Sequence, residues 1–144
     1  MNLALYEDDY FKWLVNQVDF LRNGQTDELD LANLAEEIED LGKSERRALE
    51  SDLVVLLMHL LKWQYQPMGR GNSWKYSILE HRDRLEDRLI ESPSLKPYLK
   101  EVFDKCYRKA RISAAKETEL DLMVFPEECP FTIDEVMDEE FLPS

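Results

Sequence analysis

Two histidines are the side chains of this sequence best suited to acid–base or metal chemistry. His59 lies in the apolar run Leu56–Trp63, and His81 lies on the apolar stripe of a second predicted helix. Imidazole titrates near neutral pH, so it can act as a general base or bind a metal ion. If the two helices pack antiparallel across the loop 67–73, both histidines reach the same level, because each is eleven residues from Arg70 at the middle of the loop.

Carboxylates could complete a site with these histidines. Glu36 or Glu37, together with the two imidazoles, would resemble the metal sites of helical bundles and would support metal-assisted hydrolysis or another enzyme reaction. The sequence has no Glu-x-x-His or His-x-x-x-His pair, however. We therefore favour a neutral core histidine at position 59 and solvated glutamates. No cofactor is predicted, and a metal ion bound by His59 and His81 is the alternative.

An aspartate and the aromatic residues around one loop are further candidates. Asp52 lies two helical turns before His59, so it needs a partner from a facing helix if it is buried. Trp63 and Trp74 flank the loop that carries Arg70, and they could form a pocket for an anion or a base. The alternative is that the rings close the end of a bundle and Arg70 lies in solvent. The complete candidate pocket comprises Glu36, Glu37, Asp52, His59, Trp63, Arg70, Trp74 and His81.

Known catalytic motifs are missing from the sequence. The loop around Arg70 has no P-loop or dinucleotide-binding pattern, and no serine lies in a nucleophile-elbow motif. Cys129 stands between Glu128 and Pro130, where the acidic neighbourhood should raise the pKa of its thiol. Cys106 is predicted to be a small core residue. The catalytic residues of an enzyme are therefore unknown at this point.

The composition indicates a globular helical protein. Its 144 residues are 44% apolar and include only four glycines and six prolines, too few for the many turns of a β-sandwich. The net charge of −13 disfavours nucleic acid and anionic membranes as partners. Since no apolar run could span a membrane and the first residues do not resemble a secretory signal, we expect a cytoplasmic protein.

Charge is unevenly distributed near the C-terminal end. Residues 96–116 have a net charge of +5, whereas residues 117–144 carry ten acidic and no basic side chains. We expect the acidic segment to pack near the basic helix. The alternative is that the basic helix binds an anionic partner.

Hydrophobic periodicity predicts five helices, at about 8–21, 31–65, 74–91 and 95–117, and from Thr132 to about Glu139. The first two carry apolar stripes at positions 10, 14, 18 and 21, and at 31, 34, 35, 38 and 41. Gly42 could end the second helix, but the seven-residue repeat keeps its phase through the glycine, which favours one continuous helix. Thr132 and Glu135 form a capping-box pattern.

Residues 53–61 are apolar on nearly every side, so this part of the long helix should lie at the centre of a core. The predicted fold is therefore all-α: a single-domain helical bundle of residues 1–144 with a long central helix. The acidic segment 117–144, with its short C-terminal helix, should pack on the body.

The stretch Asn33–Pro67, which ends in HLLKWQYQP, resembles the characteristic segment of the domain of unknown function 29 family. Further similar segments are YEDDYFKWL at 6–14, the segment 73–97 that ends in ESPSLKP, and the segment 117–143 that contains FPEECP. The resemblance covers nearly the whole chain. It implies a small all-α bacterial protein of one domain, and it brings no established activity or catalytic residues.

Three functions are compatible with these features. We rank first a protein-interaction or small-ligand-binding module, which binds a protein partner or itself; an exposed apolar patch would favour it. The alternative is a metal-assisted hydrolase or another enzyme with a pocket around Glu36, Glu37 and His59. Nucleic-acid binding through residues 96–116 comes last, because the acidic segment adjoins them.

Overall fold

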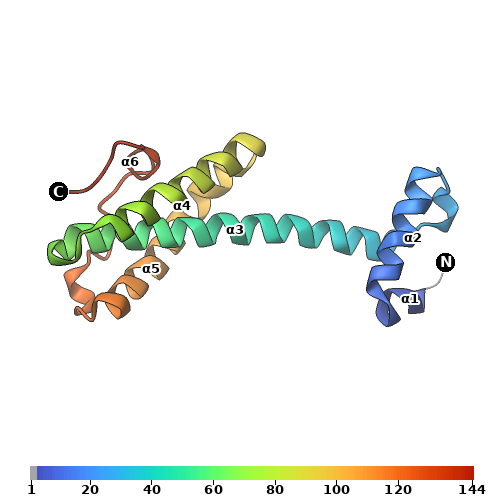
Figure 1. Cartoon of the computed structure of the whole chain (residues 1–144), viewed down its shortest axis with the longest axis horizontal. Helices are drawn as coiled ribbons and strands as arrows, with labels where there is room; N and C mark the ends of the chain where they lie inside the picture. The colour runs from blue at the N-terminus through green and yellow to red at the C-terminus, as the bar shows by residue number, and fades with distance from the viewer. Residues whose placement is uncertain (1–2) are drawn as a thin grey trace. The chain divides into compact units, whose positions relative to one another are not determined.

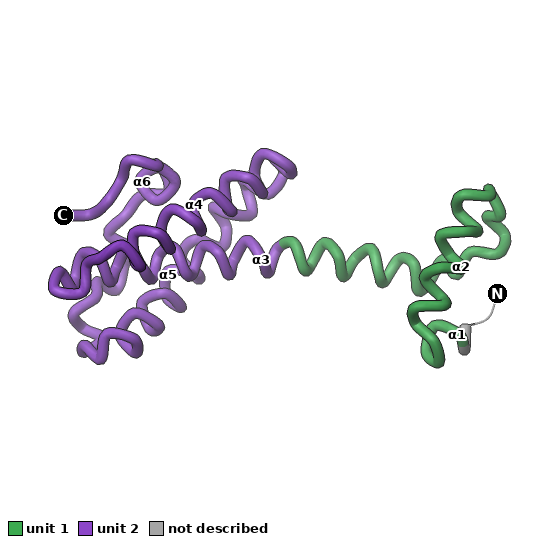
Figure 2. Tube along the Cα trace, in the orientation of Figure 1, with its two compact units in different colours: residues 1–45 green, residues 46–144 purple. Residues whose placement is uncertain are grey.

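The computed structural model describes residues 3–144, and the chain divides into two compact units, residues 1–45 and 46–144 (Figure 2). All regular structure in the described residues is helical, with six α-helices, labelled in Figure 1, and three short 3-10 helices. The all-α prediction is confirmed. The single domain stays a prediction, since two compact units can belong to one domain. Among the described residues, none of the helices combines the length and the hydropathy that a membrane-spanning segment requires.

The first unit begins with α1 (Leu3–Asp8) and α2 (Tyr10–Arg22), where the sequence predicted one helix from about residue 8. Asp9 separates the two helices, because its φ of −148° is not helical. Its carboxylate caps α2 by accepting a hydrogen bond from the backbone N–H of Lys12 at 3.1 Å. After α2 the chain turns at Gly24, whose φ of +68° favours glycine, and passes through η1 (Thr26–Glu28).

The helix α3 (Leu31–Tyr65) is 35 residues long and continues through Gly42 without a break. The prediction of one helix over residues 31–65 is confirmed. Asp30 precedes it and accepts a hydrogen bond from the backbone N–H of Asn33 at 3.4 Å, which satisfies one of the free N–H groups of the first turn.

The second unit consists of the C-terminal part of α3, η2 (Pro67–Gly69), α4 (Asn72–Glu91), α5 (Leu95–Thr118), η3 (Leu122–Val124) and α6 (Ile133–Met137). Its core is built on α3, as the sequence predicted. The leucines at positions 53, 56, 57, 60 and 61 are at most 1% exposed, and they pack with Ile78 and Leu85 of α4 and with Cys106 of α5. Cys106 is thus a core residue, as predicted.

The C-terminal segment packs on α4 and α5. Thr132 and Glu135 form the predicted capping box at the start of α6, which ends at Met137, two residues before the predicted end. Arg82 of α4 is 1% exposed, and its guanidinium donates to the carbonyl of Val136 at 2.7 Å and to that of Phe141 at 3.1 Å. On α5, Arg111 donates to a backbone carbonyl of the segment rather than to one of its carboxylates.

Candidate functional site

Glu37, a predicted site residue, is held by two tyrosines of the first unit. The hydroxyl groups of Tyr6 and Tyr10 donate to its two carboxylate oxygens, each at 2.5 Å. The bond from Tyr10 and then that from Tyr6 lower the pKa of Glu37, and the same carboxylate raises the pKa of Tyr6 to about 12. Glu36 is exposed on the same helix. Glu37 is therefore an ionised carboxylate with fixed partners, which makes it a poor general base at neutral pH.

Both histidines bond to their own helices. Nδ1 of His59 lies 2.9 Å from the carbonyl oxygen of Val55, and Nδ1 of His81 lies 2.8 Å from that of Ser77. A carbonyl can only accept, so Nδ1 carries the proton in each neutral ring and Nε2 keeps its lone pair. Burial lowers the pKa of His59, which keeps its imidazole neutral at pH 7. These bonds are those expected of a neutral core histidine, and ligand binding by either ring stays a prediction.

One group of three carboxylates among residues 3–144 lies close enough to share a metal ion. Its members are Asp83, Glu86 and Glu139, all of them exposed. Neither histidine belongs to the group, and exposed acidic residues often gather without an ion. A metal ion bound by His59 and His81 therefore stays a prediction. The pocket that combines Glu36 or Glu37 with His59 joins residues of the two units and also stays a prediction.

Asp52 has the facing-helix partners that the sequence required. Its side chain is buried, with Arg88 Nε at 3.1 Å from one carboxylate oxygen and Arg84 Nη1 at 3.7 Å from the other. Both arginines belong to α4, so the predicted partner is confirmed. The pairing neutralises a charge inside the interface of α3 and α4, a structural role.

The aromatic residues around the Arg70 loop are covered by cations of the chain itself. The Arg70 guanidinium lies 5.3 Å from the centre of the Trp63 ring, and its Nε donates to the Trp63 carbonyl at 2.6 Å. Lys62 Nζ lies 4.8 Å from the centre of the Trp74 ring and 3.2 Å from the carboxylate of Glu117. Lys62, which is only 6% exposed, was not among the predicted site residues. A charged residue inside the apolar run Leu56–Trp63 was the signal that could have indicated it.

Large apolar side chains remain exposed on the first unit. On α2, Phe11 is 74% exposed, and Val15 and Val18 lie on the same face at intervals of four and seven residues. On α3, three side chains spaced by seven and three residues are each about two-thirds exposed: Leu31, Ile38 and Leu41. We call these three residues the α3 stripe. The sequence predicted an apolar stripe at these positions, but the structure leaves it largely uncovered.

Acidic residues border the α3 stripe. Residues 1–45 carry twelve acidic and three basic side chains, a net charge of −9. Glu36, Glu39 and Asp40 are exposed on the same helix as the stripe, and the basic residue of this stretch, Lys43, pairs with Glu39 at 3.5 Å. This is a second concentration of negative charge, in addition to the predicted acidic segment 117–144. The result is an apolar surface within a strongly negative unit.

Comparison with known proteins places the chain in a family. The matching family model is described as a domain of unknown function, DUF29, and the match covers residues 5–142. No curated protein and no solved structure matches the chain. Since the match includes nearly every residue and both compact units, the chain belongs to the family of the domain of unknown function DUF29.

Proposed function

We propose that this protein is an interaction module whose first unit binds a basic amphipathic helix of a partner protein. The observation that supports this function is the α3 stripe, Leu31, Ile38 and Leu41, which is about two-thirds exposed along a helix that is itself regular and capped. A regular helix with an uncovered apolar face is ready to receive a second helix, because its backbone requires no further ordering.

The apolar area of the stripe is large enough to support binding. Complete burial of a leucine or isoleucine side chain contributes about 1.5–3 kcal/mol, so burying the exposed two-thirds contributes about 1–2 kcal/mol for each residue. Three such residues supply about 3–6 kcal/mol before the cost of association. Phe11, Val15 and Val18 of α2 offer a second exposed apolar surface on the same unit.

Charge determines which kind of helix fits. With a net charge of −9 on residues 1–45, an apolar partner surface bordered by lysine or arginine is attracted and an acidic one is repelled. A second copy of the chain would bring the same negative charge to the interface. Self-association through this unit is therefore less favourable than binding to a basic helix.

The proposal can be tested with a synthetic helix and the full chain. The probe is a fluorescent peptide of about 18 residues, roughly five turns, with leucine at the a and d positions of each heptad and lysine elsewhere. A peptide of the same composition with a scrambled order has the same charge but no apolar face. We expect fluorescence anisotropy to show tight binding of the amphipathic peptide and weak binding of the scrambled peptide.

Surface variants assign the binding to the α3 stripe. Ile38→Ser combined with Leu41→Ser removes two exposed side chains and should weaken binding by about 30- to 1,000-fold, which corresponds to about 2–4 kcal/mol. Ile90→Ser is the matched control, because Ile90 of α4 is 69% exposed and Ile38 is 67% exposed. Equal binding of both peptides, or an equal loss in the control, would contradict the proposal. A dimer in light scattering that the double variant converts to a monomer would identify a second copy as the occupant instead.

A further inference from the structure

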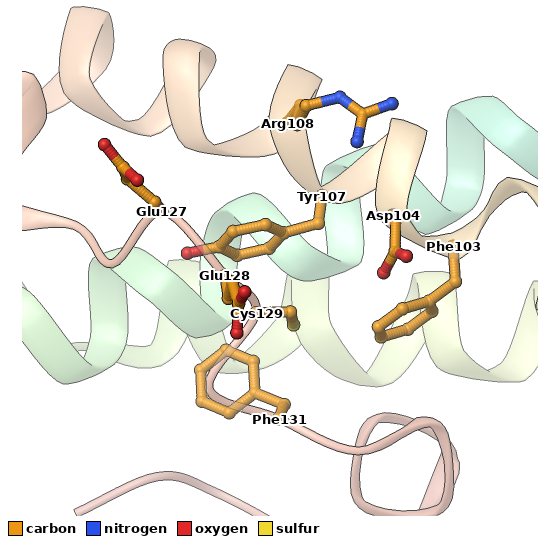
Figure 3. Close-up of a pocket in the computed structure, with 8 residues that line it drawn as sticks. All are labelled: Phe103, Asp104, Tyr107, Arg108, Glu127, Glu128, Cys129 and Phe131. Atoms are coloured by element: carbon orange, nitrogen blue, oxygen red, sulfur yellow. The ribbon is translucent and has the colours of Figure 1, made fainter.

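A pocket of about 510 Å³ lies on the second unit, between α5 and the segment that leads into α6 (Figure 3). Its volume falls in the range of small-molecule sites. Side chains from both elements line it: Phe103, Asp104 and Tyr107 from α5, and Glu127, Glu128 and Phe131 from the segment. It shares no residue with the α3 stripe, so an inference about it is independent of the proposed interaction function.

Backbone contacts hold the segment against α5 and shape the pocket in advance. The hydroxyl group of Tyr107 donates to the carbonyl of Pro126 at 2.6 Å. Arg111, one turn further along α5, donates to the carbonyl of Phe125 at 3.0 Å. Phe125 itself is 1% exposed in the core. Because both walls are fixed by these contacts, a ligand would not need to order the segment when it binds.

The inner surface of the pocket is aromatic. Phe103, Tyr107 and Phe131 are 7%, 2% and 5% exposed, and the Tyr107 and Phe131 rings lie on the two sides of Glu128 in Figure 3. The exposed carbon atoms of an aromatic ring pack favourably against alkyl carbon. Only small parts of these rings reach the pocket, so they give the carbon chain of a ligand a narrow apolar floor.

The outer surface of the pocket is acidic. Asp104, Glu127 and Glu128 are exposed carboxylates, and Arg108 is the cationic residue of the lining. In Figure 3 the Arg108 guanidinium extends away from Glu128 and Phe131. With three negative groups and one positive group at its edge, the pocket repels an anionic ligand and attracts a cationic one.

A metal ion and a compound that reacts with the Cys129 thiol fit this pocket less well than an organic cation does. Within residues 3–144, the carboxylates close enough to share one metal ion belong to a different group, that of Asp83 and its neighbours. Reaction at the thiol is disfavoured, because burial, the largest cause, raises the pKa of Cys129 to about 11 and keeps its sulfur protonated. The predicted direction of this pKa shift is confirmed, although Asp104 and Glu135 contribute less to it than burial does.

From the aromatic walls and the acidic edge we infer that this pocket binds a free aliphatic polyamine. The alkyl chain lies along the ring atoms of Phe103 and Phe131 that reach the pocket, and the ammonium groups lie at the carboxylates of Asp104 and Glu128. Carboxylates spread along the edge suit a ligand with several separated positive charges better than one with a single charge.

Calorimetric titration of the full chain with spermidine tests this inference. The variant Asp104→Asn with Glu128→Gln keeps the shape of both side chains and removes two exposed charges. We expect it to raise the dissociation constant by about 3- to 30-fold, the range for two exposed ion pairs. Glu101→Gln is the matched control, because Glu101 is exposed on the same helix and does not line the pocket. It should change the dissociation constant by less than about twofold.

A second measurement separates this pocket from general attraction to an acidic protein. Aromatic NMR signals of Phe103 and Phe131 should shift during the spermidine titration and stay in place when magnesium chloride is added at equal charge. The inference is overturned if these ring signals do not move with spermidine, if magnesium moves them equally, or if Glu101→Gln weakens binding as much as the double variant. None of these results depends on the peptide experiment, so the two proposals can fail separately.

Discussion

Replacing Asp30 with alanine tests whether one buried carboxylate holds the first unit together. Asp30 is 1% exposed. One carboxylate oxygen accepts hydrogen bonds from the indole N–H of Trp13 at 3.0 Å and from the side-chain amide of Asn33 at 2.7 Å. The other oxygen caps α3 through the backbone N–H of Asn33. The substitution therefore removes the cap of α3 and leaves a buried indole N–H without a partner.

The expected loss follows from these two effects. An N-cap aspartate contributes about 1 kcal/mol. A buried donor that loses its acceptor costs about 1–3 kcal/mol, and Trp13 is 1% exposed, so water cannot replace the carboxylate without a rearrangement. Together, Asp30→Ala should lower the free energy of unfolding of the first unit by about 2–4 kcal/mol.

Hydrogen–deuterium exchange measures this loss locally. Amides of α2 and of the first turns of α3 should exchange about 30- to 1,000-fold faster in Asp30→Ala, whereas those of α4 and α5 should not change. Asp27→Ala is the control, because Asp27 is an exposed acidic residue three positions earlier. An acceleration below about threefold, or an equal acceleration in the control, would refute the assigned role of Asp30.

The same carboxylate makes the first unit sensitive to acid. Burial alone would raise the pKa of Asp30, but the hydrogen bonds from Asn33 and Trp13 together outweigh burial and lower it below the ordinary value of 3.8. A carboxylate whose pKa is lower in the folded state stabilises the fold at pH values above its pKa in the unfolded chain. This stability is lost as the pH falls through the pKa of the folded state. Protection of α2 amides should therefore decrease below about pH 4 in the natural chain and depend less on pH in Asp30→Ala.

Two further substitutions test the second unit. Arg82→Leu removes the donors to the carbonyls of Val136 and Phe141, so limited proteolysis should cut the C-terminal segment much faster while α4 and α5 stay protected; an unchanged cutting pattern would contradict this anchoring role. Gly69→Ala places a Cβ against the Trp74 ring, inside van der Waals contact, and should lower the free energy of unfolding by about 1–3 kcal/mol in a thermal melt. Gly71→Ala has open space around its Cβ and should change the midpoint little; similar midpoints for both glycine variants would show that the contact at Gly69 relaxes without cost.

Local sequence determined the helices of this protein and their ends. The uninterrupted seven-residue repeat predicted that α3 passes through Gly42, because a broken helix would lose the phase between its two faces. The capping box at Thr132 predicted the start of α6, since its two hydrogen bonds span three residues. The exception is α1 (Leu3–Asp8), which lies before the first predicted helix; Asp9 ends α1 and its carboxylate caps α2.

For the polar residues that lie within apolar stripes, the sequence also predicted part of their surroundings. The sequence required a partner for Asp52, because an unpaired buried carboxylate is costly, but it did not identify Arg84 and Arg88. The neutral ring of His59 follows the same reasoning, since its Nδ1–H bonds to a carbonyl four residues earlier in the same helix.

Only the tertiary structure decided which residues from distant segments meet. Lys62 pairs with Glu117, 55 positions later, and the pocket forms where α5 receives the segment around Glu128. It also decided that the α3 stripe stays exposed while the leucines at positions 53, 56, 57, 60 and 61 of the same helix are buried. Periodicity specifies that a helix has an apolar face, but burial of that face depends on another element packing against it, and that is a property of long-range contacts.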